Sequence, residues 1–211
     1  MKTRIIILDP RKVEAPKIRI IVGILSRGGV IAYPTDTFYG LGANCYLDKA
    51  VKKIYEIKKR QSSKPLPVLV ADIGMARRIA SEVSPLFDSL ASEFWPGPLT
   101  VVLKAAAFLP DKLVGTQRTI GVRLPVVPWI RELIGQADFP LVATSANISG
   151  QGEIASAEIV IEVFNRRVDL IVNGGETPGR LPSTVVDLTS GKMILIREGA
   201  IPKSSLSRYL T

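Results

Sequence analysis

The chain has 211 residues, 46% of them hydrophobic and 22% charged, and its 28 Lys and Arg against 19 Asp and Glu give a formal net charge of +9. This composition is typical of a globular protein, and the positive charge favours anionic partners such as nucleotides, RNA or phosphorylated metabolites, although a solvated basic surface would give the same count. The chain contains no histidine, which excludes Ser-His-Asp and Cys-His pairs, HExxH zinc sites and histidine general bases.

The sequence shows no signal for a membrane or for secretion. No segment approaches the roughly 20 apolar residues of a spanning helix, and the apolar run at residues 5–8 is too short for a signal peptide. The single cysteine, Cys45, rules out an intrachain disulfide, and we expect it to be a small buried apolar residue. The sequence therefore predicts a soluble cytoplasmic protein without membrane contact.

Apolar segments of strand length alternate with helically periodic segments in the first part of the chain. A helix after Pro16 places apolar residues on one face and ends at Gly28-Gly29, and Asp48 is expected as the N-cap of a second helix. The strands expected here are residues 5–8, 30–33 and 67–71.

The same alternation continues to the end of the chain. Ser84-Pro85 is a capping residue followed by proline at the first helical position, and Trp95-Pro96-Gly97-Pro98 ends that helix. Short and long connections are mixed, which predicts an α/β fold with one large mixed sheet, and we treat residues 1–211 as a single domain. The further elements expected are strands at 99–104, 119–124, 141–144, 170–172, 185–188 and 193–197, and helices at 129–134 and 157–165.

Polar clusters follow or flank several of these strands. Thr35-Asp36-Thr37 comes directly after the strand at 30–33, and its hydroxyls either bind a small polar ligand or cap their own turn. Lys58, Lys59, Arg60 and Lys64 lie close together at a helix end, where the macrodipole favours cations. Since Lys64 lies in the loop beyond, a phosphate chain is the natural partner of this cluster.

Three further clusters complete the pattern. The segment 119–125 places Thr119, Gly121 and Arg123 on one face of a strand, where a buried arginine needs a carboxylate or phosphate. The segment 143–150 ends another strand in hydroxyls and an amide, and residues 181–184 and Arg197 flank the last two strands. Together the clusters predict one concave site, yet the chain has no GxxxxGK[ST] loop and no complete Rossmann fingerprint.

The order of these motifs resembles the YrdC/TsaC family of L-threonylcarbamoyladenylate synthases. The motifs span about residues 28–199 and are individually short, but their order and spacing are specific. They read PTDT-x-YGLG, K-x-R with a following KPL, T-x-x-x-R-x-P, SAN-x-SG, P-ST-V-D and a closing I-R-x-G.

The resemblance implies a YrdC-like domain with a large twisted sheet, flanking helices and a deep basic cavity. It also implies a nucleotidyltransferase reaction in which L-threonine, bicarbonate and ATP give threonylcarbamoyl-AMP and pyrophosphate. This is the first step of tRNA threonylcarbamoyladenosine modification, and a downstream transferase complex would complete it. The resemblance leaves direct binding of tRNA by this chain open.

Site residues are carried over from the family motifs position by position. Lys58 and Arg60 would be catalytic, and Mg²⁺ would come with ATP and not from protein ligands, without an organic cofactor. The threonine-side residues would be Thr35, Arg123, Ser183, Thr37 and Thr144, with Arg123 as counter-ion to the carboxylate. The ATP-side residues would be Lys58, Arg60, Thr119, Ser145, Asn147, Arg197 and Lys64.

The chain departs from many relatives at two positions, and two other functions stay open. Gln61 stands where relatives often have proline, and Leu69 or a neighbour where some have histidine. Aligning reactants and neutralising phosphate charge requires no histidine, so we expect neither an acyl-enzyme nor a catalytic triad. The alternatives are a nucleotide-dependent carbamoyl-transfer domain, as in hydrogenase-maturation proteins, and an RNA-binding module without ATP turnover.

Overall fold

The computed structural model describes residues 2–61, 65–179 and 181–210. Within them, ten strands form one mixed sheet in the order β1-β8-β2-β3-β7-β4-β6-β5-β9-β10, which confirms the predicted α/β fold with a large mixed sheet. The strands are β1 (Arg4–Ile7), β2 (Ile31–Pro34), β3 (Tyr39–Asn44), β4 (Val68–Leu69), β5 (Leu99–Lys104), β6 (Thr119–Arg123), β7 (Leu141–Ser145), β8 (Leu170–Asn173), β9 (Thr184–Asp187) and β10 (Ile194–Arg197).

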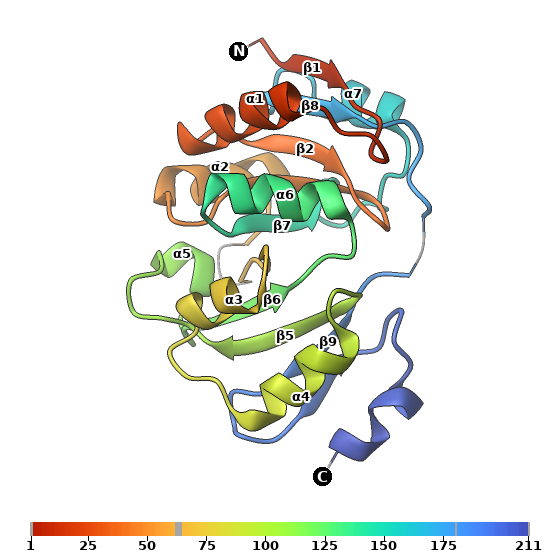
Figure 1. Ribbon diagram of the computed structural model, residues 1–211. Coiled ribbons are helices and arrows are strands. Elements are labelled where there is room, and N and C mark those ends of the chain that lie inside the picture. The colour runs from red at the N-terminus through yellow and green to blue at the C-terminus, as the bar shows by residue number, and fades with distance from the viewer. Residues whose placement is uncertain (1, 62–64, 180, 211) are drawn as a thin grey trace.

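Helices flank this sheet, and the two chain ends lie at opposite ends of it (Figure 1). In the view of Figure 1, α1 and α6 lie in front of the upper strands and α4 in front of the lower ones, while α7 lies behind. The helices are α1 (Ala15–Ser26), α2 (Asp48–Lys58), α3 (Ile73–Ile79), α4 (Pro85–Phe94), α5 (Asp111–Val114), α6 (Pro128–Ala137), α7 (Ala157–Phe164) and the 3-10 helix η1 (Lys203–Tyr209).

The end of α1 follows from its two glycines. Gly28 adopts a φ of 83°, a left-handed conformation that a glycine adopts without a steric penalty. Its N–H donates to the carbonyl of Leu25, and the N–H of Gly29 donates to that of Ile24. These bonds satisfy the last carbonyls of the helix, so the predicted stop at Gly28-Gly29 is confirmed.

Strand β6 carries the predicted alternation. Ile120 and Val122 are fully buried, whereas Thr119, Gly121 and Arg123 are half-buried. β6 pairs antiparallel with β5 and parallel with β4, so its backbone is held on both sides. One face of this strand therefore belongs to the core and the other faces away from it.

Several expectations about individual elements are wrong. Asp48 is the first residue of α2, and the N-cap is Leu47, without a side-chain capping bond. The strand expected at 67–71 is only Val68–Leu69. The sequence interpretation also missed β3, α3, α5 and η1, because β3 is rich in glycine and the other three are short.

The glycines of β3 accommodate an aromatic ring. A Cβ at Gly42 would lie 2.9 Å from Cε1 of Tyr33 and 3.1 Å from Cδ1 of Leu141, and one at Gly40 would lie 3.3 Å from the same ring. Tyr33 is fully buried, and its ring meets Trp129 edge-on at 6.2 Å between ring centres. Glycine is therefore required here by packing inside the protein.

Two predictions concern the cysteine and the membrane. Cys45 is buried, as predicted, and burial raises the pKa of its thiol. Among the described residues, none of the helices combines the length and the apolar character that a membrane crossing requires.

Replacement of Gly42 tests the packing of β3 against the Tyr33 ring. Gly42→Ala should lower the free energy of unfolding by about 1–3 kcal/mol, because the new methyl group overpacks against the buried Tyr33 ring. Chemical denaturation of both proteins measures the difference. Gly152→Ala is the matched control, since a Cβ at Gly152 meets nothing within 4 Å. Equal stability of Gly42→Ala and wild type would contradict the packing argument.

Candidate active site

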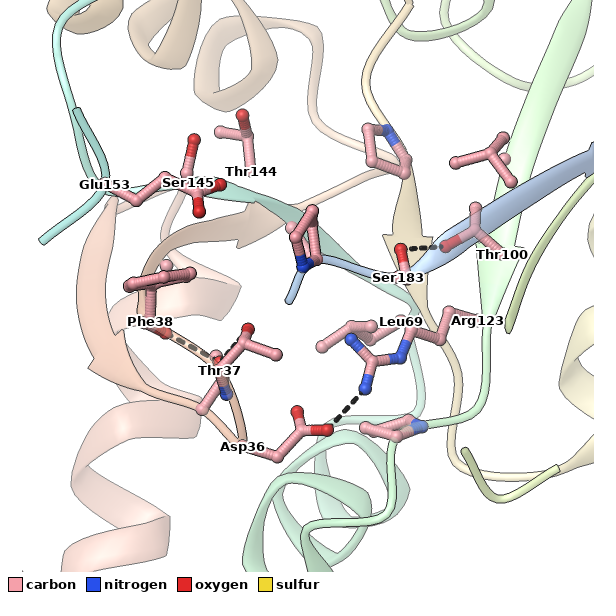
Figure 2. Close-up of a pocket in the computed structure, with 18 of the residues that line it drawn as sticks. Asp36, Thr37, Phe38, Leu69, Thr100, Arg123, Thr144, Ser145, Glu153 and Ser183 are labelled. Atoms are coloured by element: carbon pink, nitrogen blue, oxygen red, sulfur yellow. Dashed lines mark hydrogen bonds and ion pairs between the residues drawn. The ribbon is translucent and has the colours of Figure 1, made fainter. Parts of the chain in front are cut away.

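A cavity of about 530 Å³ opens among the strand ends. Its walls come from the β2–β3 turn, from β4, β5, β6 and β7, and from β9, β10 and the two residues before β9, Pro182 and Ser183. Figure 2 shows Ser145 and Glu153 on one side of it and Arg123 and Thr100 on the other. Segments far apart in the chain thus meet around one space, as the polar clusters predicted.

Most of the residues predicted for the site line this cavity. Lys58 and Asn147 lie directly behind its wall, and Lys64 falls outside the described residues. Leu69, which stands where some relatives have histidine, also lines the cavity. The predicted residues in the lining are Thr35, Thr37, Arg60, Thr119, Arg123, Thr144, Ser145, Ser183 and Arg197.

The β2–β3 turn is held by its own hydroxyls. Thr35 Oγ1 donates to the carbonyl of Phe38 at 2.6 Å and accepts from the backbone N–H of Thr37 at 3.1 Å. The hydroxyl of Thr37 lies 3.1 Å from that of Thr35. The capping role left open by the sequence is therefore confirmed, and the same two residues also line the cavity.

Arg123 is paired with a carboxylate that the sequence interpretation had left without a role. Its Nη2 donates to Asp36 Oδ2 at 2.6 Å and its Nε to the carbonyl of Gly97 at 2.9 Å. Only 11% of the Arg123 side chain and 20% of the Asp36 side chain are exposed. The carboxylate that a half-buried arginine in a strand requires is thus supplied by the turn after β2.

Lys58 joins two motifs that are distant in sequence. Its ammonium group is almost completely buried and donates to the carbonyls of Ser145 and Asn147 and to Asn147 Oδ1. Asn147 Oδ1 also accepts from the hydroxyl of Ser145 at 2.8 Å. Lys58 therefore holds the loop at the end of β7 from behind, with its protons directed at protein oxygens.

The surroundings of Lys58 lower the pKa of its ammonium group. Burial, with a smaller contribution from the Arg60 guanidinium, lowers the pKa of Lys58 to about 8, while Glu153 acts in the opposite direction. Taking a cation out of water disfavours its charged form. The amine is thus a cation at neutral pH that becomes neutral far more easily than an exposed lysine.

Arg197 and Thr100 orient the segment around Ser183. Arg197 Nη2 donates to the carbonyl of Ser183 at 2.8 Å, and the hydroxyls of Ser183 and Thr100 are 2.9 Å apart, as Figure 2 shows for the second contact. Thr100 is buried in β5 and was not predicted for the site. A polar residue at the start of an apolar strand was the available signal for it.

The charges of the described lining are mixed. Arg60, Arg123 and Arg197 face the cavity together with the carboxylates Asp36 and Glu153. Arg60 Nη2 also donates to the carbonyl of Pro65 at 3.3 Å. In the described part of the chain, no group of three or more His, Cys, Asp or Glu residues is placed to hold a metal ion.

This geometry defines a class of protein, an α/β domain in which a mixed sheet and its turns enclose a cavity lined by charged and hydroxyl side chains among apolar ones. A family model named Sua5_yciO_yrdC and described as "Telomere recombination" matches residues 23–199. The chain belongs to the Sua5/YciO/YrdC family.

Individual relatives match over nearly the whole chain. The threonylcarbamoyl-AMP synthase of Pyrococcus abyssi is 38% identical over 206 residues, which cover 98% of this chain and 61% of the relative. The crystal structure of P. abyssi Sua5 complexed with L-threonine has a TM-score of 0.92 at 38% identity, over 98% of this chain and 61% of that one. E. coli YciO has a TM-score of 0.88 at 27% identity, over 99% of this chain and 100% of that one. The chain thus spans about three fifths of the P. abyssi proteins.

Replacement of Lys58 tests its role in the β7 loop. Lys58→Met keeps most of the side-chain volume but removes the ammonium donor from the oxygens of Ser145 and Asn147, of which the Asn147 carbonyl depends on it most, so it should lower the free energy of unfolding by about 2 kcal/mol. Chemical denaturation at neutral pH measures this. Lys59→Met, at the exposed neighbouring position, should change stability little, and an equal effect of both variants would rule the role out.

The lowered pKa of Lys58 also predicts a pH dependence of stability. Between about pH 8 and pH 10.5 the folded chain releases this proton while the unfolded chain retains it, so stability should rise with pH across this window. In Lys58→Met this contribution is absent. The stability difference between wild type and Lys58→Met, from denaturation curves, should therefore be larger at about pH 10 than at about pH 7.5; a constant difference would contradict the lowered pKa.

Proposed function

We propose that this chain is a threonylcarbamoyl-AMP synthase. The observation that carries the proposal is the cavity in which the motif residues meet, in a chain whose fold matches a Sua5 described as complexed with L-threonine over 98% of its length. The 38% identity to a relative named threonylcarbamoyl-AMP synthase supports the same reading. Since the chain spans 61% of that relative, the full activity is a proposal for this chain.

The proposed reaction has two bond-forming steps. The neutral amine of threonine and bicarbonate form a carbamate and water, and a carbamate oxygen then attacks the α-phosphorus of ATP. Pyrophosphate leaves, and its oxygen retains the electrons of the broken P–O bond. The protein's task is to place the reactants in line and to balance phosphate charge.

The predicted site residues divide into a threonine set and a nucleotide set. The residues that would surround threonine line the cavity and offer it hydroxyls and a largely buried guanidinium: Thr35, Thr37, Arg123, Thr144 and Ser183. The residues that would bind the nucleotide are Arg60, Thr119, Ser145, Asn147 and Arg197, with Lys64 as a further predicted residue. Lys58 would act through the loop that it holds, because its protons are directed at Ser145 and Asn147.

Mg²⁺ and the partners follow from the chemistry of the substrates. A triphosphate brings its own metal ligands, so we expect Mg²⁺ to be held by phosphate oxygens. The product is a reactive mixed anhydride, which a downstream tRNA threonylcarbamoyl-transferase complex would consume. A cytoplasmic location fits this role.

Omission experiments test the proposal. Pyrophosphate release from ATP should require threonine and bicarbonate together, and Arg123→Ala should lower kcat/KM for threonine by about 100-fold or more, because a charge-assisted carboxylate contact is lost. Arg11→Ala removes a guanidinium from a side chain that is 92% exposed and should change nothing.

Other outcomes identify the rival functions. Pyrophosphate release without threonine would overturn the proposal and favour a carbamoyl-transfer domain. Steeply salt-dependent RNA binding without ATP turnover would favour an RNA-binding module.

A further inference from the structure

The Asp36–Arg123 pair leaves one group of each partner facing the cavity. Asp36 Oδ2 accepts from Arg123 Nη2, and the Nε of Arg123 is engaged with the carbonyl of Gly97. Within the described part of the chain, no hydrogen-bond partner lies at Arg123 Nη1 or at Asp36 Oδ1. Both residues line the cavity and point toward one another in Figure 2. A positive and a negative group are thus presented side by side.

The pair lies in largely buried surroundings. Tyr33 also lines the cavity and is fully buried. Among the described residues, its hydroxyl has no hydrogen-bond partner. Burial raises the pKa of this hydroxyl, and to a smaller extent Arg123 lowers it and Asp36 raises it. Electrostatic interactions are stronger in such an environment than in water.

This arrangement selects among charged ligands. A lone arginine would bind any small anion, including the phosphates of a nucleotide. With Asp36 beside it, an anion at Arg123 also meets a carboxylate, and like charges in a low dielectric repel strongly. A zwitterion avoids this repulsion when its two charges are adjacent, and the ammonium and carboxylate groups of an α-amino acid sit on the same carbon.

We propose that Asp36 is a substrate-binding and specificity-determining residue, whose free Oδ1 accepts a hydrogen bond from the α-ammonium group of an amino acid that Arg123 binds by its carboxylate. The Asp36–Arg123 pair then admits α-amino acids and rejects simple carboxylates and phosphates. The proposal deepens the proposed function and rests on it for the identity of the amino acid, threonine.

A purely structural ion pair is the competing explanation. In that case Asp36 serves only to tie the β2–β3 turn to β6. Asp36→Asn separates the two explanations, because the amide oxygen can still accept from Arg123 while the negative charge is lost. A structural role predicts equal effects on all ligands at this site, whereas the proposed role predicts opposite effects on zwitterions and anions.

The experiment is isothermal titration calorimetry of the full chain at neutral pH. The ligands are L-threonine and 2,3-dihydroxybutanoate, which carries a hydroxyl in place of the ammonium group. Wild type should prefer threonine. Asp36→Asn should bind threonine about tenfold more weakly and the hydroxy acid about tenfold more tightly, which lowers the preference by about 100-fold. Asp9→Asn, a change in the exposed Asp9–Arg11 pair, should leave both affinities unchanged.

The outcomes distinguish this inference from the proposed function. An unchanged preference in Asp36→Asn, or an equal loss of both ligands, would overturn the role of Asp36 and leave the synthase proposal standing. If wild type does not bind threonine, the synthase proposal fails, and the same titrations are run with the other α-amino acids. The role of Asp36 then stands if one binds and Asp36→Asn weakens it, and it is overturned if none binds.

Discussion

The site depends on the hydrogen bonds that the buried ammonium group of Lys58 donates to the loop after β7. Lys58 ends α2, and the oxygens that it binds belong to the loop that follows β7. Without this cation the backbone carbonyl of Asn147 would lose its donor and the carbonyl of Ser145 would keep the N–H of Asn147, and losing a donor to a carbonyl is costly inside a protein. The wall that carries Ser145 is therefore fixed by a charge that itself does not line the cavity, and the lowered pKa of Lys58 is the electrostatic consequence of this burial.

The sequence predicted the architecture well where hydrophobic patterns are long or end at glycine or proline. The sheet, the stop of α1 at Gly28-Gly29 and the two faces of β6 all follow from local chemistry. Strand β3 was missed because Gly40 and Gly42 lower its strand propensity, and their reason for being glycine is the Tyr33 ring on the neighbouring strand. The contact between the β3 glycines and the Tyr33 ring of β2 forms only on folding, so neither segment alone predicts it.

The site was predictable as a set of residues but not as a set of contacts. Motif positions such as Thr35, Arg123 and Ser183 do line one cavity. The partner of Arg123 could not be foreseen, since Asp36 is 87 residues away in the sequence and equally suited to capping its turn. Lys58 was expected among the ligand contacts, because a lysine in a basic cluster looks like a phosphate ligand until its three acceptors are known.

Strand β6 also fixes the distance between two of the predicted site residues. Thr119 and Arg123 are four residues apart on the same face, which at about 3.3 Å per residue separates them by about 13 Å. Because β4 and β5 hold β6 on both sides, this spacing cannot stretch when loops move. The distance between the two substrates would thus be set by the backbone of one strand, and inserting a single residue there would lengthen it and turn every later side chain to the opposite face.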